Sequence, residues 1–284
     1  MNRKKYNKTI LTMMLGVLFS YIFAGCSNNV NPGKFVAVPD NSSDMVYSED
    51  GLNWKTGQIG VPYDIWGDVY YGNGLFVAVG GEITGGKAAY STNGNNWHVD
   101  TQLITGAWKV CYGNGKFIAL GTFGSSALWA FSPNGKEWSS GQFSEAEFAG
   151  RIFKSICYGN GKFVAVGTSS GGDNYAITAS STDGKNWTLV ISPNKATWHS
   201  VCYGKGRFVA VGTTGDNSSA ITAYSTDGKI WSTEEILTYG DMNNLKSVSY
   251  GNGKFVAICG RPVNGGPPYN GFYCTFKGWN KLEF

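Results

Sequence analysis

Histidine and arginine are scarce in this sequence. Its 284 residues include two histidines, His98 and His199, and four arginines, one of which, Arg3, lies close to the N-terminus. Two histidines are too few to build a metal site on imidazole ligands. We therefore expect no bound metal and no cofactor.

An excess of positive charge is also missing from most of the chain. There are 23 basic and 19 acidic residues in all, but Arg3, Lys4, Lys5 and Lys8 fall within the first 25 residues, where there is no acidic residue. The 19 basic residues that remain balance the 19 acidic ones. A neutral chain lacks the electrostatic footprint of a nucleic-acid-binding protein, so we expect no nucleic-acid partner.

The one long apolar run lies near the N-terminus, from Ile10 to Phe23. It is too short for an ordinary membrane span, and its basic flank and the small residues after it are typical of a secretory signal. The stretch Phe23-Ala24-Gly25-Cys26 resembles the lipobox of bacterial lipoproteins, although Phe23 replaces the usual leucine. A plain signal peptide with an incidental cysteine is the alternative.

This resemblance implies cleavage before Cys26 and attachment of lipid to that residue. The expected domains are a signal peptide (1–25), a lipidated tether (26–32) and one folded domain (33–284). The protein would be exported and anchored to the cell membrane or outer membrane, facing the periplasm or the exterior.

Glycine is abundant, with 41 residues, and aromatic residues make up 15% of the chain. The pattern Gly-Lys-Phe-Val-Ala-Val recurs with small variations every 41 to 47 residues, with its phenylalanine at Phe35, Phe76, Phe117, Phe163, Phe208 and Phe255. Internal repeats of this length indicate a repeat architecture. Six repeat units follow.

Each unit is predicted to be a four-stranded antiparallel meander. In one unit the expected strands are Trp198–Tyr203, Arg207–Val211, Ala220–Ser225 and a short one around Trp231. Asn-Gly pairs between the first two strands, and Asp-Gly or Asn-Gly pairs between the last two, supply the positive φ of two-residue hairpin turns. Repeated four-stranded meanders predict an all-β fold, a β-propeller.

About six blades are expected. The first unit begins at Gly33 without a recognisable first strand, and the last unit has lost its consensus turn. Five or seven blades are therefore the alternatives, with the ring closed by a strand near Val30 or one borrowed across the termini.

The turn between the third and fourth strands reads Ser-x-Asp/Asn-Gly-x-x-Trp in five units. This resembles the Asp box of sialidase-like BNR-repeat propellers, with one residue fewer between Asp and Gly. The resemblance implies a folding element, not a catalytic one. Its residues are Ser48, Asp50, Trp54, Ser91, Asn93, Trp97, Ser132, Asn134, Trp138, Ser181, Asp183, Trp187, Ser225, Asp227 and Trp231.

The meander places its tight turns on one face and its longer, variable loops on the other. Loops carry function on rigid scaffolds, so the loop face is the expected binding surface for a protein or glycan partner of a monomeric protein. The candidate binding rim consists of Tyr63, Asp64, Phe143, Glu145, Glu147, Phe148, Tyr239, Asp241 and Tyr269.

A catalytic set is harder to find. The sialidase family needs three arginines around a carboxylate, and Arg207 of the three available, Arg151, Arg207 and Arg261, stands at a tight turn. We therefore expect no enzyme and assign no catalytic residue. A glycan-active hydrolase using paired carboxylates is one alternative, and an assembly factor for an envelope complex is another.

A second candidate site involves three equivalent positions of the first strand. Lys154, His199 and Lys246 occupy this position in successive units. We expect them to form a polar group at the mouth of the central channel, with the hypothesis of a weak anion site.

The cysteines of an exported chain invite a disulfide interpretation. Cys111, Cys157 and Cys202 share one first-strand position in successive units, which favours unbonded, buried apolar side chains. Cys259 and Cys274 fall on neighbouring strands of the last unit, and whether they pair is left open.

We predict that Cys26→Ala releases the protein from the membrane, because the lipid attachment site is lost. Cell fractionation measures the change, with Cys202→Ala as the control that keeps Cys26. Membrane retention of the Cys26→Ala protein at the wild-type level would contradict the prediction.

Overall fold

The computed structural model describes residues 34–38, 45–57, 66–82, 85–103, 106–172, 174–236, 244–259, 272–276 and 282–283. These residues form 22 strands and one short 3-10 helix, η1 (Ala146–Phe148). Within the described ranges, no helix has the length and apolar character to cross a membrane. Cys26 and the other residues of the expected signal and tether lie outside them.

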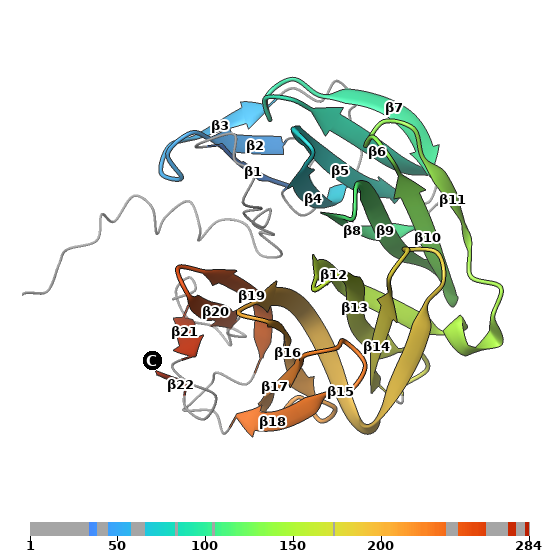
Figure 1. Ribbon diagram of the computed structural model, residues 1–284, viewed down its shortest axis with the longest axis vertical. Helices are drawn as coiled ribbons and strands as arrows, with labels where there is room; N and C mark the ends of the chain where they lie inside the picture. Colours follow the sequence, from blue (N-terminus) through green and yellow to red (C-terminus); the bar gives the residue numbers. More distant parts are fainter. Residues whose placement is uncertain are drawn as a thin grey trace, which may run out of the picture.

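Within each of five sheets, strands that follow one another in the sequence pair antiparallel, and the five sheets comprise six meanders (Figure 1). The strands, meander by meander, are β1 (Phe35–Ala37), β2 (Met45–Ser48) and β3 (Trp54–Gly57); β4 (Trp66–Gly72), β5 (Leu75–Glu82), β6 (Gly85–Ser91) and β7 (His98–Leu103); β8 (Ala107–Gly113), β9 (Lys116–Phe123), β10 (Ser126–Ser132) and β11 (Ser139–Gln142); β12 (Arg151–Gly159), β13 (Lys162–Ser169), β14 (Tyr175–Ser181) and β15 (Thr188–Gly204); β16 (Arg207–Thr214), β17 (Ala220–Ser225) and β18 (Ser232–Ile236); β19 (Leu245–Gly251), β20 (Lys254–Cys259), β21 (Phe272–Phe276) and β22 (Leu282–Glu283).

Strand β15 belongs to two meanders. Its part up to Lys195 pairs with β14, and its part from Ala196 pairs with β16. The outermost strand of one meander therefore continues without a loop into the innermost strand of the next, and the two form one seven-stranded sheet. The expected separate strand from Trp198 is the second half of this longer one, and the expected strand around Trp231 begins one residue later, at Ser232.

The meanders follow one another around a common centre (Figure 1). Their first strands β4, β8, β12, β15 and β19 contact each other in this order, so they form the inner wall. The sheet β1–β3 and the sheet β19–β22 stand at the two ends of the series, and no strand pairing among the described residues joins them.

The turns between first and second strands have the predicted geometry. In the β4–β5 turn, Gly72 pairs with Leu75, and the two residues between them, Asn73 and Gly74, have φ of 50° and 78°. Left-handed backbone at both central positions defines the type I′ hairpin. The Asn-Gly prediction is confirmed here.

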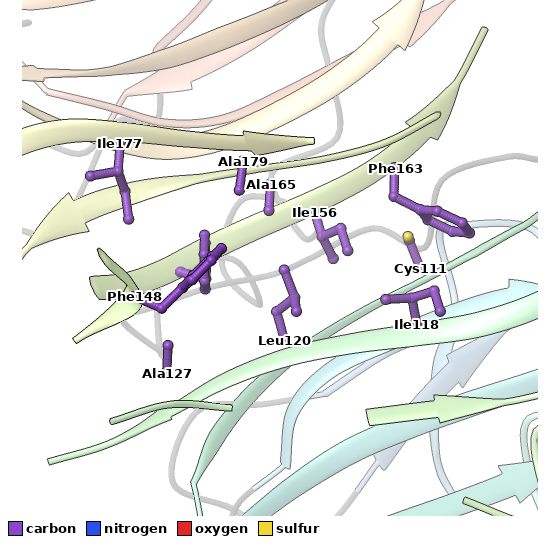
Figure 2. Packing of buried hydrophobic residues seen from close by; sticks show 11 residues of the cluster. Cys111, Ile118, Leu120, Ala127, Phe148, Ile156, Phe163, Ala165, Ile177 and Ala179 are labelled. Carbon is purple, nitrogen blue, oxygen red and sulfur yellow. The ribbon is translucent and has the colours of Figure 1, made fainter. Parts of the chain in front are cut away.

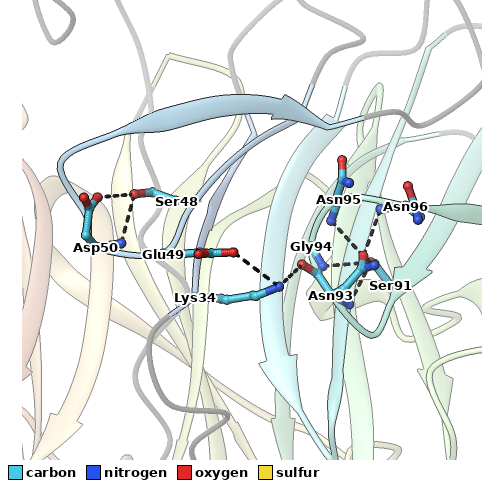
Figure 3. Close-up of polar contacts among 9 residues, drawn as sticks. All are labelled: Lys34, Ser48, Glu49, Asp50, Ser91, Asn93, Gly94, Asn95 and Asn96. Carbon is cyan, nitrogen blue, oxygen red and sulfur yellow. Dashed lines mark hydrogen bonds and ion pairs between the residues drawn. The ribbon is translucent and has the colours of Figure 1, made fainter.

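The turns between third and fourth strands differ from the prediction of two-residue hairpins. β6 ends at Ser91 and β7 begins at His98, and only Gly94 of the intervening Asn-Gly pair has a positive φ, 71°. The turn is longer because side chains occupy its amides: Gly94 N–H donates to Ser91 Oγ (2.9 Å), and the N–H groups of the next two residues donate to Asn93 Oδ1 (2.9 Å each). Figure 3 shows this turn beside the equivalent one at Ser48 and Asp50.

The hydrophobic core lies between the meanders. One cluster joins Ile118 and Leu120 of β9 to Ile156 of β12 and Phe163 of β13, all nearly inaccessible to solvent (Figure 2). Trp187 packs against the same cluster. Each large side chain buried in this way contributes about 1.5–3 kcal/mol, and it does so only when the neighbouring meander is present.

Glycines let the inner strands approach each other. A β-carbon added at Gly159 of β12 would lie 2.0 Å from Cγ of Tyr203 in β15, and one at Gly204 would lie 2.1 Å from Cγ of Tyr250 in β19. Gly72 and Gly113 make the same contact with Tyr112 and Tyr158. An added β-carbon at the equivalent Gly251 meets no described residue within 4 Å.

We predict that Gly159→Ala destabilises the fold by about 1–3 kcal/mol, because the new methyl group overlaps the Tyr203 ring. Gly251→Ala is the matched control, since no described residue lies within 4 Å of a β-carbon at this equivalent position, and it should change the free energy of unfolding by less than about 0.5 kcal/mol. Urea denaturation of both variants tests this. Equal losses would contradict the packing role of the glycine.

Candidate functional site

Five of the nine candidate rim residues, Tyr63, Asp64, Tyr239, Asp241 and Tyr269, lie outside the described residues. The other four occupy the segment between β11 and β12. Here the prediction for Phe148 is wrong: its side chain is only 2% exposed, and its ring stacks on Phe143 with centroids 4.3 Å apart. Phe148 also packs near Phe153 in the core. Phe148 therefore anchors the segment in the core, whereas Phe143 is partly exposed and stays a candidate for the rim.

Glu145 and Glu147 are exposed on this segment. Its backbone is held in place, because Gly150 N–H donates to the Ser125 carbonyl (2.7 Å) and Arg151 Nε donates to the Glu147 carbonyl (2.9 Å). The two carboxylates are thus presented on an ordered loop of the face opposite the Asn-Gly turns. We call this the loop face, and the face that carries the Asn-Gly and Ser-x-Asp/Asn-Gly turns the turn face.

The three first-strand residues predicted to form a polar group occupy equivalent irregularities in the strand pairing. The register between first and second strands shifts at Lys154, at His199 and at Lys246. A β-bulge re-aims the side chain of its extra residue. All three lie near the start of an inner strand, at the end directed to the loop face.

Interstrand hydrogen bonds fix the relative heights of these strands. Val201 N–H of β15 donates to Ser155 Oγ of β12 (3.2 Å), and Val248 N–H of β19 donates to Ser200 Oγ of β15 (3.2 Å). The repeated bond holds each strand at the same level as its neighbour. Lys154, His199 and Lys246 consequently stand side by side.

His199 is held in place by a short polar chain. Its Nε2 lies 3.1 Å from Thr213 Oγ1, whose hydroxyl donates to Asn244 Oδ1 (2.8 Å). Because that hydroxyl proton is given to Asn244, His199 Nε2–H is the donor to Thr213, and Nδ1 is left as an acceptor. Partial burial, with the positive charges of Lys246 and Lys154, lowers the pKa of His199 to about 3, so the imidazole is neutral near pH 7.

Lys109 joins this group, which the sequence did not reveal. Its Nζ donates to the Gly67 carbonyl at 2.7 Å, and its charge acts on Lys154. Partial burial, together with the charges of Lys246 and Lys109, lowers the pKa of Lys154. We refer to Lys109, Lys154, His199 and Lys246 as the inner-strand basic group.

A buried carboxylate lies close to this group. Asp68 of β4 accepts hydrogen bonds from Val69 N–H (2.8 Å) and, across to β8, from Val110 N–H (2.9 Å). Burial raises its pKa to about 6, against the opposing effect of the Lys109 charge. Asp68 is thus engaged in holding two inner strands together.

The lysines of the turn face have partners that the sequence did not indicate. Lys34, Lys116 and Lys162, each just before a second-strand phenylalanine, donate from Nζ to the backbone carbonyls of Asn93 (3.4 Å), Asp183 (3.2 Å) and Asp227 (3.0 Å). Each bond reaches the Ser-x-Asp/Asn-Gly turn of the next meander. These lysines therefore tie neighbouring meanders together.

A shallow hollow of about 470 Å³ lies beside the loop after β16, lined by Lys195, Thr214, Gly215, Asp216 and Ser218. Thr214 Oγ1 donates to Asp216 Oδ1 (2.6 Å), and Ser218 donates to the same carboxylate from its N–H and its hydroxyl. These bonds lower the pKa of Asp216 to about 2. It stays ionised at neutral pH and cannot supply a proton as a general acid there.

Cys111, Cys157 and Cys202 are free thiols, as predicted, with the first two buried and Cys202 partly exposed. Cys259 pairs across the sheet with Phe272, and Cys274 pairs with Ala257, so the two cysteines lie on adjacent strands in diagonal positions. Among the described residues, no three His, Cys, Asp or Glu side chains are grouped to hold a metal ion.

The chain is similar in fold to solved β-propellers. A catalytically inactive virginiamycin B lyase from Staphylococcus aureus with quinupristin matches with a TM-score of 0.65 and 10% identity, over 93% of this chain and 87% of the other. A six-bladed lectin from Aleuria aurantia matches with a TM-score of 0.59 and 10% identity, over 95% and 96% of the two chains.

A putative glucose dehydrogenase from Thermus thermophilus matches with a TM-score of 0.58 and 11% identity, over 86% and 92% of the two chains. No protein-family model matches the chain, and no curated protein matches it. At such low identity the likeness establishes the fold alone. The chain is an all-β protein with a β-propeller fold.

We predict that His199→Gln makes stability less dependent on pH. The unfolded chain binds a proton on histidine below about pH 6.5, whereas folded His199 stays neutral down to about pH 3, so stability falls as pH is lowered through this interval. One such group contributes a slope of up to about 1.4 kcal/mol per pH unit. Urea denaturation of both proteins at pH 7, 6 and 5 measures it; identical slopes would show that His199 titrates normally.

Proposed function

We propose that the chain is an exported, lipid-anchored propeller of six four-stranded blades that binds a protein or glycan partner through its loop face and catalyses no reaction. The observation that carries this proposal is that the polar side chains of the two faces differ in how they are engaged. On the turn face, the Ser, Asp and Asn side chains are engaged in bonds within their own turns, and Lys34, Lys116 and Lys162 are engaged in bonds that hold blades together. The loop face presents carboxylates and basic groups outward.

Six blades are supported by the six meanders and by the similarity to a six-bladed lectin. The first meander has three strands in the described part of the chain, where the next two meanders have four each. A fourth strand beside β1, between the first and last meanders, would complete the ring. We propose that it is borrowed across the termini, one of the two sources that the sequence leaves open, so that the chain before Lys34 remains the tether.

The direction of the anchor is consistent with binding on the loop face. Lys34, eight residues after Cys26, donates to the Asn93 carbonyl of a turn-face turn (Figure 3). A chain that enters at the turn face and is lipidated at Cys26 keeps that face near the membrane. The loop face then points away from it, toward a partner.

The basic side chains support a binding role over a sialidase-like one. Arg151 starts β12 at the loop face, and Arg207 starts β16 at the turn face, where its guanidinium lies 5.8 Å from the centre of the Tyr224 ring. Arginines on opposite faces cannot grip one carboxylate. Asp216, the acid best defined on the loop face, is held ionised.

The test is to capture partners from the organism's own envelope with the full chain as bait and to identify them by mass spectrometry. We predict that reversing charge on the loop face, with Glu145→Lys and Glu147→Lys together, reduces capture of the principal partner at least fivefold, because the surface potential at the interface changes sign.

Glu137→Lys is the matched control, since Glu137 is exposed in the same blade but on the turn face. It should leave capture unchanged. Equal losses in the two variants would contradict the assignment of the loop face. Turnover of a glycan panel with no captured partner would contradict the binding role itself.

A further inference from the structure

We infer that the inner-strand basic group binds an oxyanion, the carboxylate, sulfate or phosphate group of a ligand. This inference rests on the proposed function, because it names the chemistry of the ligand that the loop face takes. The group stands on four consecutive inner strands, β8, β12, β15 and β19. Its members therefore line one continuous stretch of the inner wall, and their charges act on one another.

The first argument is the alignment of the group. The bonds from Val201 N–H to Ser155 Oγ and from Val248 N–H to Ser200 Oγ set the three bulges at one level. Each bulge then presents its extra side chain from an equivalent position. Three adjacent strands thus deliver two ammonium groups and an imidazole to the same end of the inner wall.

The second argument is the lack of internal neutralisation. Among the described residues no carboxylate forms an ion pair with Lys154 or Lys246, whereas Lys34 of the turn face pairs with Glu49 (Figure 3). The charge of Asp68 acts on Lys109, and its two oxygens accept from backbone N–H groups, so Asp68 balances Lys109 and leaves Lys154 and Lys246 without a counter-charge. Like charges held together without a counter-charge raise each other's free energy, and a bound anion removes this cost.

The third argument is that the basic side chains are accessible to solvent and keep hydrogen-bond donors for a ligand. Lys154 and His199 are partly exposed, and Lys246 is exposed. Lys109 uses one donor on the Gly67 carbonyl and keeps two. Ammonium groups bind oxyanions as point charges with several rotatable donors, so the site tolerates carboxylate, sulfate and phosphate geometry.

His199 adds a different property to the site. Its Nε2 is engaged with Thr213, and its Nδ1 is an acceptor while the ring is neutral. A neutral acceptor beside two ammonium groups suits a hydroxyl next to the anion, as in an acidic saccharide. A free inorganic oxyanion uses the lysines alone.

The experiment uses the full chain in a nonionic detergent and follows the Hε1 signals of its two histidines by NMR. Sodium sulfate is titrated at constant ionic strength against sodium chloride. We expect the His199 signal to move with saturation and its pKa to rise as the bound charge offsets Lys154 and Lys246. The His98 signal, on β7 beside Tyr90, is the internal control and should stay in place.

Lys154→Gln and Lys246→Gln should each weaken sulfate binding about tenfold, the usual effect of losing one charge-assisted hydrogen bond. Lys229→Gln, an exposed lysine of a turn-face turn, should change it less than twofold. These are surface substitutions, and the His98 signal reports whether the fold is kept. Equal effects of all three lysine variants would overturn the inference.

Sodium glucuronate and glucose separate the sources of the anion. Tighter binding of glucuronate than of sulfate supports an acidic saccharide, and tighter binding of sulfate supports a free oxyanion; glucose should not bind at this site. A His199 signal that follows sulfate and glucuronate no more than chloride overturns the inference. If neither anion binds while capture from the envelope depends on Glu145 and Glu147, the anion site is contradicted and the proposed function is kept. If the anions bind but the loop-face substitutions leave capture unchanged, the proposed function is contradicted and the anion site is kept.

Discussion

The contact between neighbouring blades is the interaction on which the rest of the structure depends. A four-stranded sheet with apolar side chains on both faces is stable only when both faces are covered, and in this fold the neighbours provide the cover. The close approach of inner-strand glycine to tyrosine, as between Gly159 and Tyr203, brings the inner strands together. The glycines of the Ser-x-Asp/Asn-Gly turns also allow close packing between blades. A β-carbon at Gly184 would lie 2.3 Å from Cδ1 of Ile118 in the preceding blade.

This constraint separates the two faces chemically. Turn-face side chains are committed to the joints between blades, as Lys162 is to the Asp227 carbonyl. The contacts between blades also align the loop-face ends of the inner strands. The inner-strand basic group at these ends keeps side chains that take no part in those contacts. Rigidity at one face therefore preorganises the other, which is the condition for selective binding with little entropic cost.

Periodicity and turn chemistry made much of the fold predictable. The repeated Asn-Gly pairs placed the hairpins of the first two strands correctly, because a two-residue turn with two left-handed residues has few other sequences. The Ser-x-Asp/Asn-Gly turns were predicted too short, since their length depends on side-chain acceptors that replace backbone pairs. The continuous strand β15 was missed because the absence of a loop between two blades leaves no mark in the pattern.

The site was less predictable, because burial and distance are properties of the folded chain. Phe148 looks like a loop aromatic in the sequence, and only the stacking on Phe143 reveals it as core. Strand β8 has no bulge, so Lys109 is shifted by one position of the repeat relative to Lys154 and His199. Aligning the repeats therefore does not group it with them. Lys154, His199 and Lys246 could be grouped from the sequence because they occupy the same position of the repeat in three units.

Hydrogen–deuterium exchange of the full chain, free and bound to its captured partner, tests the central claim most directly, because it reports on both faces at once. The account predicts that binding slows exchange in residues 143–150 and 215–219 of the loop face and leaves the turns at 73–74, 114–115 and 160–161 unchanged. Slowing confined to those turns, with free exchange in the loops, would contradict it.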